Sequence, residues 1–378
     1  MKYIKKLEDI PQLSAAERAA LTPVAEQYAF RVSDYYLGLI DWSDPADPIR
    51  QLVIPRADEM NDWGKLDASN EAANTVARGV QHKYPDTALL LCNEVCGAYC
   101  RYCFRKRLFM DENQEVTKDL TPGYEYIRQH PEITNVLLTG GDPLLQSTRR
   151  LTEIIEALRA IDHVKIIRIG TKMTAFVPGR VTKDPALLEM LAKNSTAGKR
   201  IYFMNHFDHP RELTDEAQEG LDLLTKAGVI HTNQCPLIAG INDHAATLSD
   251  LYKRLSWAGV PPYYLFQGRP TAGNDPYKVP IVRGWEIFRE ALRHGAGLAR
   301  RARFVMSHET GKIEILAVDE KQIYLRYHRA KDANLRGRFM IYQRNDDAYW
   351  LDDLVPASGT DAPKFAHESE FDVVDGPE

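Results

Sequence analysis

The sequence of 378 residues predicts an α/β protein built on a partial barrel of six parallel strands. Six short apolar runs alternate with segments of helical periodicity, and such a series implies right-handed crossovers and a parallel sheet. Each run also ends in glycine-rich or reactive residues, and active sites of barrels form at the carboxyl ends of the strands. The runs are TALLLC, TNVLLTGG, VKIIRIGT, KRIYFMNHF, VIHTNQCPLI and PYYLFQG. Six units suit an open barrel better than the closed form, which has eight.

Residues 1–80 precede these runs and are predicted to be an N-terminal helical extension with a connecting arm. Ser14 and Glu17 match a capping box in front of a helical stretch. Residues 57–75, here called the arm, are polar, rich in Asp and Asn, and carry little pattern. We therefore expect a helix to begin just after Ser14 and the arm to connect it to the barrel.

Between the apolar runs, several segments have the spacing of amphipathic helices. The apolar residues of the first such segment are Leu151, Ile154, Ile155 and Leu158. We assign residues 81–298 to the partial barrel on this basis. Residues 299–355 read as short strands and turns, and residues 356–378 as a loose tail that is polar and acidic.

Composition and charge exclude several classes of function. A net charge of −5 at pH 7 argues against a protein that binds nucleic acid through bulk positive charge. No apolar run approaches the length of a membrane span, and the N-terminus lacks the apolar core of a signal peptide. We therefore expect a cytoplasmic protein, in whose reducing surroundings the five cysteines favour metal or redox chemistry over disulfides.

Three cysteines, Cys96, Cys100 and Cys103, form a compact C-x3-C-x2-C motif. A four-iron cluster normally takes four thiolates, so three thiolates leave one iron open, as a catalytic centre requires. Cys92 falls on the preceding strand, where we expect it to act as a small buried hydrophobe. The alternative is a structural zinc site made by all four cysteines, although zinc ligands usually come as two separated pairs.

Eight stretches, including the cysteine motif, resemble the lysine 2,3-aminomutase family of radical S-adenosylmethionine enzymes. They are DPIRQLVIP, HKYPDTALLL, YCRYCFRKR, LLTGGDPLL, IRIGTK, NHFDHP, NQCPLIAGINDHAATLSDLYKRLSWAGVPPYYL and GKIEI. They follow the family's order with similar spacing, from about residue 30 to about residue 330. The resemblance implies a radical-SAM partial (βα)6 barrel. It also implies an isomerase that moves the α-amino group of an amino acid to C3 and so makes a β-amino acid.

The resemblance further implies a 4Fe-4S cluster on the three cysteines and S-adenosylmethionine bound to its open iron, where it yields a 5′-deoxyadenosyl radical. A glycine-rich turn of the family holds the methionine amino group. In this chain the turn comprises Gly140, Gly141, Asp142 and Pro143. Asn205, His206 and Gln234 are candidate contacts to this cofactor or to a second one. The alternative for each of these three is a hydrogen-bonded core group.

The family's second cofactor is pyridoxal phosphate, bound as a Schiff base to a lysine. The stretch HETGKIEI resembles the segment around that lysine, which makes Lys312 the candidate. Lys83 and Tyr84 stand where the family contacts the phosphate, while Thr87 replaces a second arginine that the family often has. Residues 299–355 are accordingly the predicted pyridoxal-phosphate-binding segment.

The resemblance also assigns the substrate contacts. The family's arginine at the place of Arg105 binds the α-carboxylate, whereas Lys106 and Arg107, taken singly, read as solvated surface groups. Lysine-specific members hold the distant ammonium with two aspartates, and this chain has Arg269 and Ser307 at those places. Because a guanidinium repels an ammonium, we expect an acidic or neutral substrate such as glutamate.

Three nearby charges bear on that expectation. Arg301 and Arg303 add positive charge, and Glu309 compensates only if its side chain points inward. The alternative is that Arg269 turns to solvent, or contacts a cofactor phosphate, and that lysine is still accepted.

Two other functions stay open from the sequence. A related mutase modifies a lysine of elongation factor P, although those proteins usually have shorter C-termini. A non-catalytic iron–sulfur protein would keep the cysteines without needing Lys312, Arg105 and the glycine-rich turn together.

Partners follow from the implied reaction, which needs an amino acid substrate and an electron donor such as flavodoxin or ferredoxin. Lysine-specific members bind zinc between subunits through a C-terminal cysteine cluster, but this chain has no cysteine after Cys235. We therefore expect no structural zinc, and any homo-oligomer has to be held by other contacts.

Overall fold

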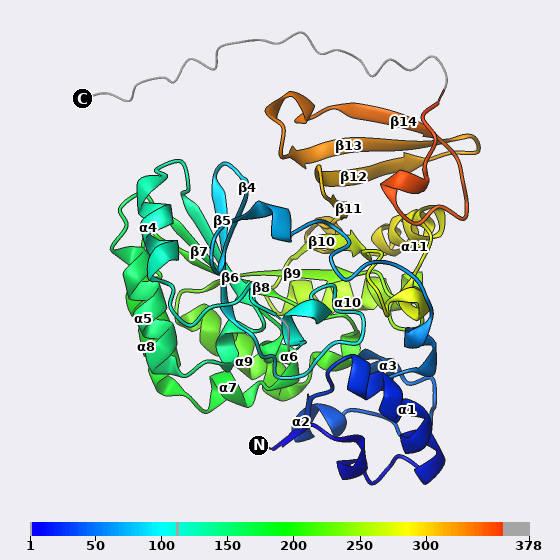
Figure 1. The fold of residues 1–378 in the computed structure, drawn as a ribbon, viewed down its shortest axis with the longest axis horizontal. Coiled ribbons are helices and arrows are strands. Elements are labelled where there is room, and N and C mark those ends of the chain that lie inside the picture. The colour runs from blue at the N-terminus through cyan, green and yellow to red at the C-terminus, as the bar shows by residue number, and fades with distance from the viewer. Residues whose placement is uncertain (1, 111–112, 358–378) are drawn as a thin grey trace.

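A twelve-stranded sheet organises the structure, a computed structural model that describes residues 2–110 and 113–357 (Figure 1). Seven neighbouring strands of this sheet run parallel. They are β5 (Thr87–Asn93), β6 (Asn135–Gly140), β7 (Ile166–Thr171), β8 (Ile201–Asn205), β9 (Ile230–Pro236), β10 (Pro262–Gln267) and β11 (Arg303–His308). Within the described residues the outermost strands, β3 and β14, do not pair with each other, so the barrel stays open. The predicted partial barrel is confirmed.

The structure has one more parallel strand than the six that the sequence predicts, because β11 pairs in parallel with β10. The chain then turns back in antiparallel hairpins that extend the sheet beyond the barrel (Figure 1). These strands are β12 (Gly311–Val318), β13 (Gln322–Ala330) and β14 (Phe339–Gln343). The sequence predicts strands and turns here, but a short apolar run has the same pattern in a parallel and an antiparallel setting.

Helices lie outside the parallel strands (Figure 1). The longer ones are α4 (Thr121–Gln129), α5 (Thr148–Arg159), α8 (Pro185–Asn194), α9 (Asp215–Lys226), α10 (Ala245–Trp257) and α11 (Ile281–Arg293), and two short ones are α6 (Met173–Phe176) and α7 (Gly179–Thr182). Helix α5 buries the four apolar residues whose spacing predicts it: Leu151, Ile154, Ile155 and Leu158. Apolar periodicity therefore located this helix and its buried face correctly.

Alternation along β7 separates the two faces of the barrel wall. Ile167 and Ile169 are fully buried in the core, whereas Arg168 and Gly170 line a cavity inside the barrel. Successive side chains of a strand point to opposite faces, so one face of β7 supports the fold and the other serves the cavity.

The N-terminal residues form a helical layer at one end of the barrel (Figure 1). It contains β1 (Tyr3–Ile4), α1 (Ala15–Gln27), β2 (Val32–Ser33), α2 (Asp34–Leu37) and α3 (Pro48–Val53). Ser14 and Glu17 form the predicted capping box at the start of α1. After the arm, β3 (Thr75–Ala77) and β4 (Val80–Tyr84) add antiparallel strands to the edge of the main sheet.

The arm lies along the loop that follows β10 and is held there by hydrogen bonds. The Lys65 main-chain N–H donates to the Pro270 carbonyl oxygen at 2.9 Å, and the Ala272 N–H donates to the Lys65 carbonyl oxygen at 3.2 Å. Ser69 Oγ donates to the Ser307 carbonyl oxygen at 2.9 Å. A stretch without sequence pattern is therefore a fixed part of the barrel mouth.

The predicted polar tail, residues 356–378, lies outside the described residues from residue 358 onward. Just before that point, Pro356 pairs with Tyr342 on β14. In the part of the chain that the structure describes, every helix is too short or too polar to span a bilayer.

Candidate active site

A cavity of about 350 Å³ lies inside the open barrel and reaches the carboxyl ends of its strands. Residues at or just after these ends line it, namely Gly140, Thr171, His206, Pro236, Gln267 and Ser307. Most predicted site residues line the same cavity: Lys83, Tyr84, Cys96, Cys100, Cys103, Arg105, Gly140, Gly141, Asp142, His206, Gln234, Arg269, Ser307 and Lys312. The strand ends, where barrel sites form, therefore bring most of the predicted site residues together in one cavity.

Two predicted site residues, Pro143 and Asn205, do not line the cavity. Pro143 is buried at the start of a short 3-10 turn. Asn205 is fully buried, accepts a hydrogen bond from Thr174 Oγ1 at 3.1 Å and donates to the Thr232 carbonyl oxygen at 3.2 Å. Asn205 thus joins β8 to its neighbours, which is the alternative role of a hydrogen-bonded core group.

The glycine-rich turn after β6 packs against the start of the cysteine loop. The Gly141 N–H donates to the Asn93 carbonyl oxygen at 2.5 Å, and Gly140 has a φ of +112°, which other residues rarely adopt. A Cβ atom on Gly141 would collide with the backbone of Val95. The glycine pair therefore lets the loop that carries Cys96 approach the end of β6.

The three thiols of the motif, on Cys96, Cys100 and Cys103, face this shared cavity. Among the described residues no three His, Cys, Asp or Glu side chains converge on a single metal ion. Burial raises the pKa of all three thiols, so binding of iron has to displace their protons. Cys92 is buried on β5 outside the cavity, with Sγ 3.6 Å from the Thr139 carbonyl oxygen, as expected for a small core residue.

The Asp142 carboxylate ties the ends of two strands together. It accepts hydrogen bonds from Thr171 Oγ1 at 2.8 Å, from the Lys172 N–H at 2.7 Å and from the Leu144 N–H at 3.0 Å. Burial raises the pKa of Asp142 to about 6, although these hydrogen bonds favour its charged form. Since the carboxylate is occupied, the main chain of the turn is the part that remains for a ligand.

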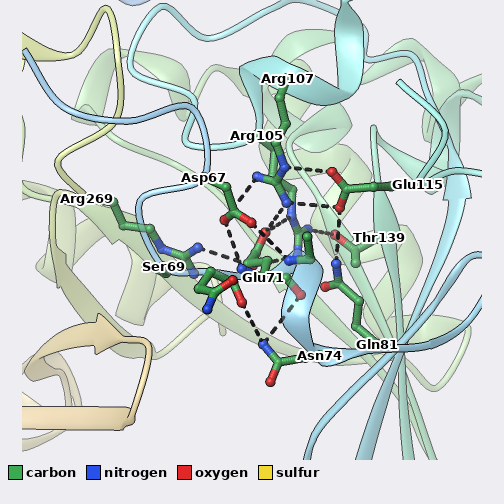
Figure 2. A network of polar contacts seen from close by, with 12 residues as sticks. Asp67, Ser69, Glu71, Asn74, Gln81, Arg105, Arg107, Glu115, Thr139 and Arg269 are labelled. Atoms are coloured by element: carbon green, nitrogen blue, oxygen red, sulfur yellow. Dashed lines mark hydrogen bonds and ion pairs between the residues drawn. The ribbon is translucent and has the colours of Figure 1, made fainter. Parts of the chain in front are cut away.

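Glu71 of the arm lies at the centre of a cluster of arginines (Figure 2). Its two oxygens accept from Arg105 Nε at 3.2 Å and Nη2 at 3.3 Å, and from Arg107 Nη2 at 3.2 Å. Arg269 Nη1 lies 3.2 Å from Oε1 of Glu71, and Arg105 Nη1 donates to Thr139 Oγ1 at 2.6 Å. Burial alone would raise the pKa of Glu71, but the three guanidinium charges outweigh burial and hold it well below its usual range. No motif in the sequence marks Glu71.

The expectation that Lys106 and Arg107 are solvated is wrong, because the arm covers them. The Lys106 side chain is 5% exposed and lies 3.6 Å from Glu59, while Arg107 Nε donates to Glu115 at 2.7 Å. Arg101, inside the cysteine loop, pairs with Glu59 at 2.7 Å, and both side chains are almost completely buried. The cations after the motif therefore attach the arm to the cysteine loop.

Arg269 points into the barrel rather than to solvent. Its side chain is 15% exposed, lines the cavity and stacks on the Phe104 ring at 3.8 Å. Glu309 is exposed and does not line the cavity, and Arg303 pairs at the surface with Glu314. The counter-charge of Arg269 is therefore Glu71, which it shares with Arg105 and Arg107.

Lys312 lies on β12, directly across the β11–β12 hairpin from Ser307. Its Nζ is 4.3 Å from the centre of the Tyr264 ring and 4.5 Å from that of Phe266. It makes no side-chain hydrogen bond or ion pair with any residue that the structure describes. Burial and then neighbouring cations lower the pKa of Lys312 well below its ordinary value, which favours the neutral, nucleophilic amine.

Four cations surround the Lys312 amine: Lys83, Arg168, Arg269 and Arg329. Arg168 Nε donates to Asn135 at 2.8 Å, and Arg329 stacks on Tyr84 at 4.2 Å. Arg329 also pairs with Asp86, and its side chain is 29% exposed. The grouping of these cations around an amine whose pKa is lowered suits a phosphate group. Arg168 and Arg329 were missed from the sequence, although an arginine in the apolar run VKIIRIGT was a usable signal.

His206 belongs to a buried polar network beside the cysteine loop. Lys172 Nζ pairs with Asp208 at 2.5 Å and with Glu212 at 2.7 Å. His206 Nε2 lies 3.0 Å from Asp208 and 3.0 Å from the Tyr102 hydroxyl, which also donates to Asp208. This network fixes the loop after β8 against the loop that carries the thiols.

Comparison with known proteins identifies relatives that match between about 78% and 94% of the chain. A family model described as "4Fe-4S single cluster domain" matches residues 87–188. An Aquifex aeolicus protein named "Putative L-lysine 2,3-aminomutase" is 54% identical over 94% of this chain and 95% of that protein. L-lysine 2,3-aminomutase of Clostridium subterminale is 34% identical over 79% of this chain and 71% of that protein. Glutamate 2,3-aminomutase of Clostridioides difficile is 33% identical over 78% of this chain and 69% of that protein.

These relatives carry the names of aminomutases, which are isomerases, and the first of them covers nearly the whole chain. The matched cluster domain runs from β5 to the start of α8 and includes the three cysteines and the glycine-rich turn. Both findings agree with a cavity that brings these features together at the strand ends. The chain belongs to the lysine 2,3-aminomutase family of radical S-adenosylmethionine enzymes.

Proposed function

We propose that the chain is a 2,3-aminomutase that prefers an acidic or neutral α-amino acid, such as glutamate, over lysine. The charge of the cavity carries this proposal. Apart from the Lys312 amine, six cationic side chains line it, namely Lys83, Arg105, Arg168, Lys172, Arg269 and Arg329. The acidic residues that line it are Glu71 and Asp142. An ammonium group on the substrate would enter a site of its own sign.

Both acidic residues are already occupied. Asp142 accepts from Thr171 and from two main-chain N–H groups, and Glu71 is shared by three arginines. Neither carboxylate is therefore free to hold the ammonium of lysine. A like charge at 4 Å costs about 4 kcal/mol at an effective dielectric constant of 20, enough for a preference of roughly a thousandfold.

We assign the iron–sulfur cluster to Cys96, Cys100 and Cys103, and S-adenosylmethionine to the main chain of Gly140 and Gly141, with His206 and Gln234 as further contacts. The cluster and this cofactor supply the radical when they are bound. The protein's part is to hold the three thiolates on one loop and to press the glycine turn against it. The fixed loop gives the substrate a fixed distance to the reacting centre.

We assign pyridoxal phosphate to the Lys312 amine, with Lys83, Tyr84, Arg168 and Arg329 around its phosphate. This cofactor supplies an aldehyde that binds amines covalently. Lys312 fits because burial and nearby cations lower the pKa of its amine and so favour the neutral form, and the cations fit because a phosphate offsets them. The two arginines take the place of the family arginine that Thr87 replaces.

Arg105 is proposed to bind the α-carboxylate of the substrate. A guanidinium grips a carboxylate with two parallel hydrogen bonds, which fixes the direction of the Cα–Cβ bond. Fixing this bond decides which hydrogen of C3 faces the radical. Arg269, at the other end of the substrate, then selects the side chain by its charge.

Side-by-side turnover tests the proposed substrate class. Reduced, iron-loaded protein with both cofactors is supplied with lysine, glutamate, aspartate or alanine, and β-amino acids are measured. We expect kcat/KM for at least one of glutamate, aspartate and alanine to exceed kcat/KM for lysine by roughly a hundredfold or more. A clear preference for lysine contradicts the proposed substrate class. No turnover of any free amino acid points instead to a protein-bound lysine or a non-catalytic protein.

A further inference from the structure

Glu71 connects the two arginines that the proposed function assigns to the substrate. Its Oε1 accepts from Arg105 Nη2 at 3.3 Å and lies 3.2 Å from Arg269 Nη1, so both guanidiniums meet on one oxygen atom (Figure 2). Glu71 belongs to the arm, Arg105 follows the cysteine motif and Arg269 follows β10. Three segments that are far apart in the sequence therefore converge on a single carboxylate.

The hydrogen bonds of Arg105 leave part of its guanidinium for a ligand. Nε and Nη2 donate to the two oxygens of Glu71, and Nη1 donates to Thr139 Oγ1. A guanidinium carries five N–H groups, and after these three bonds one remains on each terminal nitrogen. A pair of this kind matches the two oxygens of a carboxylate. Glu71 thus uses N–H groups of Arg105 other than the two that remain for a ligand.

Arg269 is more open still. Among the described residues its ion pair is with Glu71, and its guanidinium stacks on Phe104 at 3.8 Å while lining the cavity. In the part of the chain that the structure describes, no other protein group accepts from its N–H groups, which are free to bind a second anionic group. The two guanidiniums together therefore offer places for two carboxylates.

The arm holds Glu71 in place. Main-chain hydrogen bonds join Lys65 to Pro270 and Ala272, and Ser69 is bonded to the Ser307 carbonyl oxygen. Gly64 lies so close to the loop after β10 that a Cβ atom there would collide with it. A carboxylate on a fixed segment orients its partners, because it cannot move aside without breaking these bonds.

We propose that Glu71 is a specificity-determining positioning residue, which holds Arg105 and Arg269 as one receptor for the two carboxylates of an α-amino dicarboxylic acid. The inference rests on the proposed function, which assigns Arg105 to the α-carboxylate. It adds that the second carboxylate binds Arg269 and that the arm sets the spacing of the two guanidiniums. A neutral amino acid uses Arg105 alone and so depends less on Glu71.

The test compares Glu71→Gln with Glu115→Gln in fully loaded protein. Without a reductant there is no turnover, so calorimetric titration measures the Kd of glutamate, aspartate and alanine. Glutamine keeps the shape of Glu71 but turns an N–H donor toward a guanidinium, which also donates. Glu115 is the matched control, because it belongs to the same network but contacts Arg107 and neither Arg105 nor Arg269 (Figure 2).

We expect Glu71→Gln to weaken dicarboxylate binding by roughly tenfold or more and alanine binding by less than about threefold. Glu115→Gln should leave the ratio of the two affinities unchanged. Glu71→Asp, which keeps the charge on a shorter side chain, should fall between wild type and Glu71→Gln. The iron content and the borohydride-reducible pyridoxal adduct of each variant report whether it is folded and loaded.

An unchanged ratio of dicarboxylate to alanine affinity in Glu71→Gln overturns the proposal. A higher ratio overturns it as well and makes Glu71 a competitor of substrate carboxylates. The affinities of the wild-type protein distinguish a failure of the proposed substrate class from a failure of the proposed role of Glu71. If wild type prefers lysine, the substrate class is wrong and the role of Glu71 falls with it. If wild type prefers dicarboxylates and Glu71→Gln does too, by the same ratio, only the role of Glu71 is wrong.

Discussion

The surroundings of Lys312 show how burial and charge prepare a single amine for reaction. Two aromatic rings lie within 4.5 Å of its Nζ, and nearby cations oppose its protonation. The lowered pKa of such a lysine favours the neutral amine, which is the form that attacks a carbonyl. In the proposed function, the same cations attract the phosphate of pyridoxal phosphate to the amine that binds it.

Replacing Lys312 with alanine should abolish the borohydride-reducible pyridoxal adduct. The control is Lys321→Ala, which changes an exposed lysine in the same C-terminal segment and should keep the adduct at its wild-type level. Mass spectrometry of the reduced, digested protein measures the adduct. An adduct that persists in Lys312→Ala would place the reactive lysine elsewhere.

Pyridoxal phosphate should bind more weakly as the pH rises above about 8. Burial, and then the charge of Arg269, lowers the pKa of Lys83 to about 8, so this lysine is charged below that pH and neutral above it. The phosphate keeps its full charge over this range, since its second pKa is about 6. Absorbance titrations from pH 7 to 9.5 measure the affinity. Lys83→Met should bind more weakly at pH 7 and lose this pH dependence, and an unchanged slope would contradict the assignment.

At the scale of elements, the arm and the cysteine loop form one unit. Arg101 stands between two residues of the motif, and its ion pair with Glu59 is excluded from solvent. Removal of one partner of a buried pair leaves an uncompensated charge, which costs more than the pair contributed. The loop that presents the thiols thus depends on a segment that carries no motif of its own.

Glu59→Gln should lower the free energy of unfolding by about 3–5 kcal/mol, because Arg101 then stays buried without a counter-charge. It should also reduce the iron bound per chain, since Arg101 lies within the cysteine loop. Chemical denaturation and iron analysis measure the two effects. Glu125→Gln breaks an exposed pair with Arg128 and should change neither quantity measurably. Equal stability of the two variants would show that the Glu59 pair does not fix the loop.

For the molecule as a whole, the charge of the cavity differs from that of the protein. The chain carries a net charge of −5, yet cationic side chains outnumber acidic ones among the residues that line the cavity. Field lines from these cations are concentrated inside the low-dielectric barrel, so an anionic substrate is attracted there and a cationic one is repelled. The net charge of the protein therefore does not predict the charge of the substrate, whereas the charge of the cavity does.

Arg269→Asp should raise the kcat/KM of lysine relative to that of glutamate by roughly a hundredfold or more, because it replaces repulsion with attraction. Arg301→Asp makes the same change of charge at an exposed position outside the cavity and should leave the ratio unchanged. Competition between the two amino acids in one reaction mixture measures the ratio directly. Equal ratios in Arg269→Asp and wild type would mean that Arg269 does not face the substrate.

The sequence by itself determined the features that depend on neighbours along the chain. The spacing of Cys96, Cys100 and Cys103, the pair of glycines after β6 and the apolar periodicity of α5 are all local. These features suffice to predict the family, the open barrel and the position of the cavity at the strand ends. The replacement of an expected aspartate by Arg269 was also visible, because it is a change at one position of a motif.

Only the tertiary structure decided which distant residues meet. Glu71 and Arg105 are 34 positions apart, and Arg168, Arg329 and Lys312 come from different strands. Their meeting depends on how the sheet curls and on which face each side chain takes, and neither property leaves a periodic trace in the sequence. For the same reason the arm looked featureless: its structure comes from its partners on the barrel and not from its own residues.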